Sequence, residues 1–254
     1  MSKTLLTAVC AIALLAACSP SGDTITVVSW NVGVLSKYQQ SSLPDVAALI
    51  LGSRADAVCL NELDSCNRRH NSYQIRDLAD SLGSWPFYFA SAFAFAGGAY
   101  GNGIVSREPI LRRSRIALPA FDGAEPRSCA VIETKRFVLG ATHLDHKGDT
   151  ARSSQARIIT SWFTDHYAGY DKPVFLCGDF NSLPDSNVLE QLSKDWDLLS
   201  GTTPTYPSDG PVRCIDYIFA LRTATPVRIL SASPDTTCRT ASDHLPVKVV
   251  VKCN

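Results

Sequence analysis

The amino-acid sequence predicts an α/β protein in which two packed β-sheets are flanked by helices. Short apolar runs rich in β-branched residues recur along the chain, whereas only three segments place apolar residues at helical spacing. The 254 residues are 45% hydrophobic, which is enough to fill one large core. No internal repeat, low-complexity tract or interdomain linker follows Asp23, so we expect a single domain over residues 24–254.

The first half of this domain alternates expected strands with expected helices. Strands are predicted where apolar and β-branched residues run together, at residues 25–31, 57–60 and 104–106. Helices are predicted at residues 44–51 and 73–82, because Pro44 suits a first helical turn and Gly83 suits a helix end.

The second half is dominated by expected strands. They are predicted at residues 128–134, 137–142, 174–177, 217–219, 227–230 and 247–251. The short Lys135-Arg136 connection lets the first two of these pair as a hairpin. A helix is predicted at residues 152–166, where Ala156, Ile159 and Phe163 share one face.

The first 17 residues are typical of a targeting segment, with one basic side chain at Lys3 and an apolar run too short to span a bilayer. The run ends in Leu15-Ala16-Ala17-Cys18, which resembles the lipobox of bacterial lipoproteins. The resemblance implies that residues 1–17 are a signal peptide, that Cys18 is lipidated and that residues 18–23 form a tether. The alternative is an ordinary secretory signal with a chance cysteine. We expect an exported protein, lipid-anchored on the periplasmic or cell-surface side of a bacterial membrane.

The charge balance argues against a protein that grips long nucleic acids. The chain has 24 basic and 24 acidic side chains, and removal of the signal would leave 23 against 24, a net charge of −1. Proteins that hold long polynucleotides usually carry a basic excess. A local basic patch remains compatible with this neutral total.

Polar residues repeatedly follow or interrupt the apolar runs. Loops at strand ends can gather side chains from distant parts of the chain into one cleft. Six such groups are too many to have arisen independently by chance. They are Ser29-Trp30-Asn31, Leu60-Asn61-Glu62, Thr142-His143-Leu144-Asp145, Gly178-Asp179-Phe180-Asn181, Ile215-Asp216-Tyr217 and Ser242-Asp243-His244.

These residue types suit the hydrolysis of a phosphate ester. Glu62 with the amide of Asn31 could hold Mg²⁺, which prefers oxygen ligands and keeps several waters. The attacking water needs a base, and Asp216 could orient His244 to act as one.

The transition state also needs hydrogen-bond donors for the equatorial phosphate oxygens. His143, Asn181 and Arg127 could supply them. Asp179 and Asn181 are two residues apart, so in extended chain they would face the same side of the cleft.

The six groups resemble the endonuclease/exonuclease/phosphatase superfamily, whose order they follow over about residues 25–251. The resemblance implies a four-layered α/β sandwich, DNase I-like, with the site at one end of two facing sheets. It also implies a phosphoric ester hydrolase that uses Mg²⁺, or Mn²⁺, held around Glu62 with contributions from Asn31 and Asp243.

The remaining roles are carried over by position. His143 resembles the family's phosphate-contacting histidine, Asp179 and Asn181 resemble the groups that position water and phosphate, and Asp216 and His244 resemble its carboxylate–imidazole pair.

Two further residues match the family more loosely. Arg127 resembles a phosphate-binding arginine of the pancreatic-type deoxyribonucleases, and the alternative is a solvated loop arginine. Asn102, within Tyr100-Gly101-Asn102-Gly103-Ile104, resembles a segment that lines the cleft and would contact substrate. Asp145 and His146 could be further ligands, but we expect them to be exposed loop residues.

Departures from the family leave the substrate open. Gly33 stands where abasic-site endonucleases carry an acidic residue, and Cys214-Ile215-Asp216-Tyr217 differs from the Trp-Cys-Asp-Arg segment of inositol polyphosphate 5-phosphatases. The substrate could be a lipid headgroup, a small phosphoester or a nucleic acid, as a monoester or a diester. We expect a monomer. The alternatives from other classes are a non-catalytic surface binding protein and a structural lipoprotein.

The cysteines give one further prediction. Cys214 lies near Asp216 and Cys238 lies near Asp243, so if both carboxylates meet in one site, these two cysteines should be neighbours. Export permits oxidation, so we predict a Cys214–Cys238 disulfide. A pair of Cys66 with Cys129 is the second candidate.

Overall fold

The computed structural model describes residues 24–253, and the predicted signal peptide, Cys18 and tether lie outside the described residues. One six-stranded sheet has the order β11 (Val227–Pro234), β12 (Val247–Cys253), β1 (Thr24–Asn31), β2 (Ala57–Ser65), β4 (Gly98–Ser106) and β3 (Phe87–Phe95). The other has the order β5 (Arg112–Leu118), β6 (Arg127–Glu133), β7 (Val138–His143), β8 (Val174–Asp179), β10 (Asp216–Leu221) and β9 (Trp196–Leu198).

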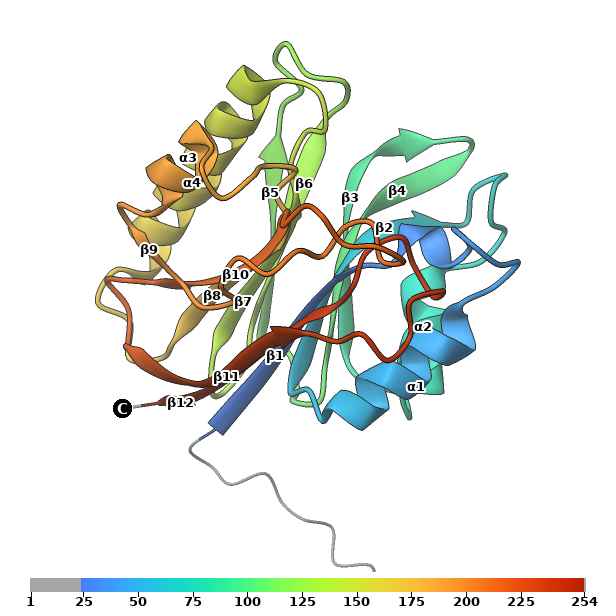
Figure 1. Ribbon diagram of the computed structural model, residues 1–254, viewed down its shortest axis with the longest axis horizontal. Helices are drawn as coiled ribbons and strands as arrows, with labels where there is room; N and C mark the ends of the chain where they lie inside the picture. Colours follow the sequence, from blue (N-terminus) through green and yellow to red (C-terminus); the bar gives the residue numbers. More distant parts are fainter. Residues whose placement is uncertain (1–23, 254) are drawn as a thin grey trace, which may run out of the picture.

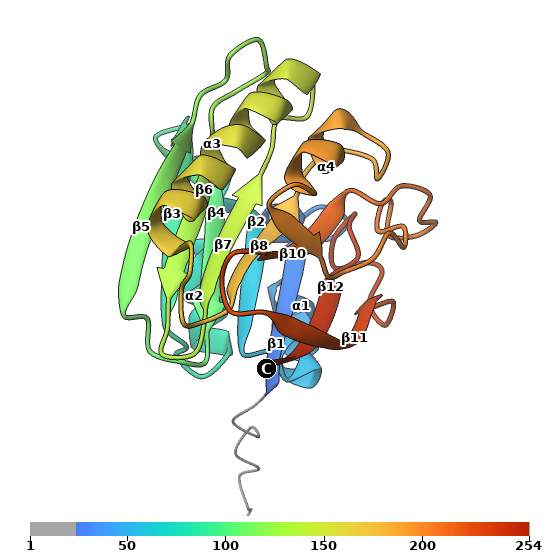
Figure 2. The same cartoon turned by 90° about the vertical axis from the view of Figure 1, so that its left-hand side faces the viewer.

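The helices lie on the outer faces of the two sheets (Figures 1 and 2). They are α1 (Leu43–Ser53), α2 (Gln74–Ser81), α3 (Asp149–Tyr167) and α4 (Asn187–Leu192), and a short 3-10 helix, η1 (Gly33–Leu35), follows β1. In Figure 1, α1 and α2 cover one sheet on the right, and α3 and α4 cover the other on the left. Among the described helices, none combines the length and the apolar character needed to cross a membrane.

Three apolar clusters hold the four layers together. Side chains such as Val27, Phe175 and Val249 fill the space between the two sheets. A second cluster joins α1 and α2 to the first sheet, and a third joins α3 and α4 to the second sheet. The predicted four-layered α/β sandwich is therefore confirmed.

The strand directions explain why the polar groups meet. Each sheet has one parallel pair at its centre, β1 with β2 and β7 with β8, and the other pairs are antiparallel. Asn31 lies beside Asn61, and His143 lies beside Asp179. Asp216 is the first residue of β10 and pairs with Asp179 at the end of antiparallel β8. All these positions therefore lie at the same end of the sandwich.

The sequence patterns did not predict η1, β3, β5, α4 or β9, and they predicted β2, β4 and β11 too short. Strand β3 has no β-branched residue, and β5 is an edge strand that buries only Ile116 and Leu118 within its bounds. Helix α4 and strand β9 are too short to show a period. β4 begins at Gly98, well before the predicted start, and β2 runs on to Ser65 after a change of register between Leu60 and Leu63.

The predicted disulfides are wrong. Cys214 and Cys238 are free thiols, because Cys214 packs in the cluster under α3 while Cys238 packs against the cluster under α1. Cys66 and Cys129 are also free, since Cys66 is exposed and Cys129 is completely buried. Asp216 and Asp243 lie at the same site, but Cys214 and Cys238 remain apart, because each thiol packs against a different sheet.

Candidate active site

A cleft of about 350 Å³ opens at the end of the sandwich where the parallel strands terminate. Seven of the ten predicted site residues line it: Glu62, Arg127, His143, Asp179, Asn181, Asp243 and His244. Asn31 and Asp216 lie directly beneath, where they contact Asp179 and His244 respectively.

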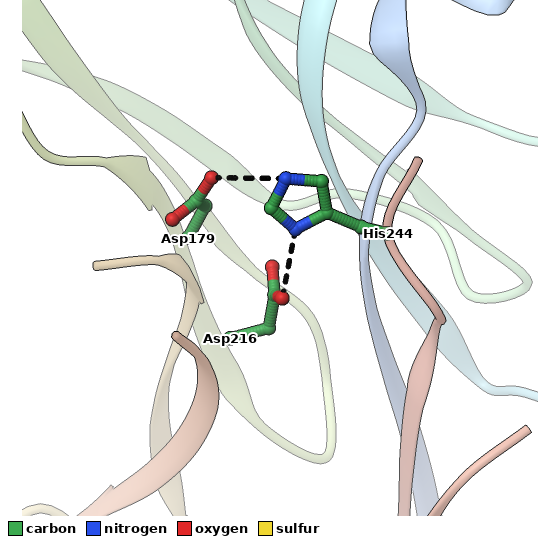
Figure 3. A group of neighbouring side chains, drawn as sticks. All are labelled: Asp179, Asp216 and His244. Carbon is green, nitrogen blue, oxygen red and sulfur yellow. Dashed lines mark hydrogen bonds and ion pairs between the residues drawn. The ribbon is translucent and has the colours of Figure 1, made fainter. Parts of the chain in front are cut away.

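Asp216 and His244 form the predicted carboxylate–imidazole pair. Oδ2 of Asp216 lies 2.9 Å from Nδ1 of His244 and also accepts a 2.5 Å hydrogen bond from the Thr205 hydroxyl. The Tyr206 ring flanks the imidazole at 4.7 Å between centroids. Bonding through Nδ1 leaves Nε2 directed toward Asp179, at 3.7 Å from its Oδ2 (Figure 3). The imidazole is thus held between two buried carboxylates.

Asp179 lies at the centre of the site. Its Oδ2 accepts a 3.1 Å hydrogen bond from the Asn31 amide and faces Nε2 of His143 at 3.5 Å. Its Oδ1 accepts the backbone N–H of Asn181 at 2.9 Å. Gly178 is required just before it, because a Cβ at that position would lie 1.7 Å from the carbonyl oxygen of Thr142.

Burial and neighbouring charges shift the pKa values of these groups. Burial raises the pKa of Asp179 to about 7, although the charge of His244 opposes the shift. Burial disfavours the charged form of His244, but Asp216 and Asp179 outweigh it and raise its pKa to about 10. Burial and the charge of Arg127 lower the pKa of His143 well below its usual value. These shifts favour a charged His244 and a neutral His143 at neutral pH.

His143 and Asn181 lie beside each other in the cleft. The Asn181 amide lies 3.0 Å from Nε2 of His143 and donates a 3.1 Å hydrogen bond to the carbonyl oxygen of Leu144. Asn181 has a φ of +47°, which is uncommon outside glycine and aims its side chain back over the strand end. The Asn181 amide and the neutral His143 imidazole can donate hydrogen bonds to phosphate oxygens.

Arg127 is buried rather than a solvated loop residue. Its side chain is 3% exposed, and its guanidinium contacts Glu125 at 3.1 Å and Nδ1 of His146 at 3.1 Å. Among the described residues, its Nε has no hydrogen-bond partner. This arrangement places a fixed positive charge on the wall of the cleft.

The residues around Glu62 fit a hard cation. Glu62 has a φ of +57°, lies partly exposed in the cleft, and accepts a 3.2 Å hydrogen bond from the Asn31 amide. The oxygen donors of Glu62, Asn31 and Asp243 are the type that Mg²⁺ and Mn²⁺ prefer. Asp243 is also bound by the Lys37 ammonium at 3.1 Å. Burial opposes that ammonium, but Glu62 and Asp243 outweigh it and raise the pKa of Lys37.

A second group could also hold a metal ion by its composition. Asp179, Asp216 and His244 place one ligand atom each within 4.8 Å of one another. However, the imidazole ring itself lies between the two carboxylates, with a nitrogen directed at each (Figure 3). The ring already supplies the positive charge there, so we favour Glu62 as the cation site.

Asn61 is the functional residue that sequence reasoning passed over. Its amide donates to the carbonyl oxygen of Thr142 at 2.8 Å and to Oδ1 of Asn102 at 3.0 Å, and its oxygen accepts the N–H of Asp179 at 3.0 Å. It thus joins the two sheets directly behind the site. An amide within an apolar strand was the available signal.

Asn102 and Asp145 differ from their predictions. The Asn102 amide is 2% exposed, bonded to Asn61 and to the carbonyl oxygen of Ser128, so the predicted substrate contact is not supported. Asp145 is completely buried, not an exposed loop residue. Its carboxylate accepts backbone N–H groups from two loops, which a strand-end position does not reveal.

Comparison with known proteins agrees with this geometry. A profile of the Endonuclease/Exonuclease/phosphatase family matches residues 28–244. Among curated proteins, none matches this sequence.

Solved structures with the same fold include an endonuclease/exonuclease/phosphatase from Beutenbergia cavernae, with a TM-score of 0.77 and 22% identity over 91% of this chain and 72% of that one. A mannosyl-6-phosphatase from Bacteroides thetaiotaomicron has a TM-score of 0.73 and 20% identity over 89% and 99%. The human Nocturnin catalytic domain with bound sulfate has a TM-score of 0.69 and 19% identity over 91% and 95%. The chain therefore belongs to the Endonuclease/Exonuclease/phosphatase family, a family of hydrolases.

Proposed function

We propose that the protein is a divalent-cation-dependent phosphoesterase that hydrolyses its substrate by direct attack of water. The observation that carries this proposal is the position of Asp179, which contacts Asn31 from the first sheet and faces both His143 and His244. One carboxylate therefore connects the candidate cation site, the phosphate wall and the carboxylate–imidazole pair.

Cation chemistry would come from Mg²⁺ or Mn²⁺ held by Glu62, with Asn31 and Asp243, and would polarise a phosphate oxygen. The protein's own groups would do the rest. His143, Asn181 and Arg127 bind the phosphate oxygens and stabilise the charge that develops on them. These three donors line the same cleft as Glu62.

The attacking water needs a proton acceptor within the same cleft. Asp179 and His244 face each other at 3.7 Å, and the pKa values of both groups are raised. We propose that this pair accepts the proton of the water. Asp216 holds the imidazole in place and stabilises its charged form.

A small phosphoester is the substrate class that we favour. The cleft holds about 350 Å³, and the cationic side chains that line it include Lys37, Arg127 and Arg213. The similarity to a mannosyl-6-phosphatase favours a phosphomonoester of a small polar molecule. A nuclease is the second candidate, although the net charge of −1 after signal removal argues against a long polynucleotide.

The experiment is an activity screen with and without EDTA. It would cover small phosphomonoesters, phosphoinositides, sphingomyelin, RNA and plasmid DNA, with Asp179→Asn as the inactive control. We expect EDTA-sensitive release of phosphate from a small ester. Turnover that survives EDTA would remove the cation-dependent mechanism, and the absence of any turnover would favour a non-catalytic binding protein.

We also propose that the protein is exported and anchored by lipid at Cys18, because Leu15-Ala16-Ala17 precedes this residue. The Cys18→Ser variant should then appear in the soluble fraction of cells, whereas the parent fractionates with membranes. A variant that stays with the membranes would remove the lipobox interpretation.

A further inference from the structure

Lys37 lies in the catalytic cleft among the carboxylates assigned to the cation. Its ammonium is 3.1 Å from Oδ2 of Asp243, and Glu62 and Asp179 line the same cleft. The Lys37 side chain is 44% exposed, whereas that of Asp243 is only 11% exposed. The pair is therefore a partly desolvated contact on the cleft wall, not an ion pair on the open surface.

The chain before Lys37 makes room for this contact. Gly33 has a φ of +51°, a conformation that favours glycine. A Cβ at this position would lie 2.9 Å from Cβ of Lys37 and 3.4 Å from Oδ1 of Asp243. Any larger residue at position 33 would therefore push the lysine and the aspartate apart.

Side chains from the end of β2 and from α2 then fix the segment in place. The Ser36 hydroxyl lies 3.0 Å from Nε2 of His70, whose Nδ1 lies 2.6 Å from Oδ2 of buried Asp64. The Gln74 amide donates a 2.6 Å hydrogen bond to the carbonyl oxygen of Val34. These contacts hold the residue that precedes Lys37 and the turn behind it.

The Ser36–His70–Asp64 distances also resemble a nucleophilic relay, but Asp64 receives two more hydrogen bonds of 2.8 Å from Arg69. The hydroxyl group lies one residue before Lys37 on a segment that the other contacts immobilise. A positioning role accounts for every contact in this network.

We propose that Lys37 is a built-in counter-charge that takes the place of a second cation, so that the cleft binds a single divalent ion at Glu62. Asp243 can still offer the ion an oxygen, but the ammonium offsets its negative charge, so Glu62 is the carboxylate that attracts the cation. A fixed positive charge in the same cleft also weakens the binding of a cation, because like charges repel in a partly buried site. This inference rests on the proposed cation site.

The test is a calorimetric titration of Mn²⁺, without phosphate, into the purified full chain in mild detergent. Lys37→Met removes the charge and keeps the length of the side chain. Lys147→Met removes an exposed lysine and is the matched control. We expect one Mn²⁺ per wild-type chain, and either a second equivalent or roughly tenfold tighter binding for Lys37→Met.

Two further variants keep the result interpretable. Lys37→Arg retains the charge and should bind like the wild type, and His70→Ala should shift the affinity in the same direction as Lys37→Met by a smaller factor. Equal affinity and stoichiometry for Lys37→Met and wild type would overturn this inference alone, as would two equivalents in the wild type. Binding that is absent, or that Glu62→Gln leaves unchanged in every variant, would remove the proposed cation site as well.

Discussion

The two sheets place different chemistry at equivalent positions. In each sheet the central parallel pair ends at the cleft, with Asn31 and Glu62 on one side and His143 and Asp179 on the other. Glu62 is partly exposed, whereas Asp179 is 2% exposed and has its pKa raised to about 7. Burial therefore separates a carboxylate that suits a cation from one that suits a proton.

The proton-transfer unit pairs Asp216 of the second sheet with His244, which precedes β12 of the first sheet, and its loss should have the largest effect. Asp216→Asn and His244→Ala should each lower turnover by about 10²–10⁴-fold, the usual range for general acid–base catalysis. Their effects should be strongly non-additive, because one residue acts through the other. His143→Ala should combine nearly independently with Asp216→Asn.

A double-mutant cycle on the best substrate measures these couplings, with thermal melts to exclude misfolding. Additive losses for Asp216 and His244 would contradict the assignment, even if each residue alone proved essential.

The loss of Asn61, which links the two sheets, should have the next largest effect. Asn61→Ala leaves the N–H of Asp179 and the carbonyl oxygen of Thr142 without their partner, so we expect a loss of about 3 kcal/mol in unfolding free energy. Asn67→Ala is a matched control, because its buried amide bonds only within the first half. Urea denaturation compares their stabilities, and only Asn61→Ala should also lower the turnover of the folded enzyme. Equal turnover losses would show that Asn61 does not couple the halves.

Cation affinity should distinguish the Glu62 carboxylate from the Asp179 carboxylate. Glu62→Gln should weaken Mn²⁺ binding roughly 100-fold, the upper range for perturbing a metal site, and Asp179→Asn should change it much less. Glu125→Gln is the control, since Glu125 lines the same cleft but pairs with Arg127. Calorimetry checks this order. If Asp179→Asn weakened Mn²⁺ binding more than Glu62→Gln, the roles assigned to these two carboxylates would be reversed.

The sequence was informative where a polar residue broke an apolar pattern. Asp216 within Ile215-Asp216-Tyr217 has no local reason to interrupt the apolar run, and the family resemblance implied that His244 is its partner. Asn61 also interrupts an apolar run, but only its neighbour Glu62 was predicted as a site residue. The fold class followed from the same apolar patterns, because most buried strands have strong β-branched runs.

What the sequence did not reveal depends on tertiary neighbours. Strand β5 exposes Arg112, Arg113 and Arg115, because only one of its faces meets the core, so its pattern is weak. Lys37 lies in an ordinary polar loop, and its place beside Asp243 depends on contacts with residues far along the chain. The buried state of Asp145 likewise depends on the loop before β6.

Two buried aspartates, one in each sheet's half of the site, allow a further comparison of the two sheets. Asp64 and Asp145 each lie two residues beyond the site residue of β2 and of β7, and both are completely buried. Burial opposes ionisation in both, but hydrogen bonds outweigh it and lower both pKa values. The bonds come from the side chains of Arg69 and His70 in the first case, and mainly from backbone N–H groups in the second.

These aspartates should give the smallest effects, because each contributes to stability and not to chemistry. Asp64→Asn and Asp145→Asn should each lower the unfolding free energy by about 1 kcal/mol at pH 7. A carboxyl group whose pKa is depressed on folding stabilises the protein above its ordinary pKa and loses that effect as the pH falls through the folded value. The difference between wild type and each variant should therefore narrow below about pH 4. Urea denaturation from pH 7 to pH 3 measures this.

In 1 M NaCl the stability difference between wild type and Asp64→Asn should also narrow, because the Arg69 side chain is 41% exposed and open to screening. The stability difference between wild type and Asp145→Asn should persist. Identical salt responses would show that side-chain and backbone donors stabilise the two strand ends in the same way.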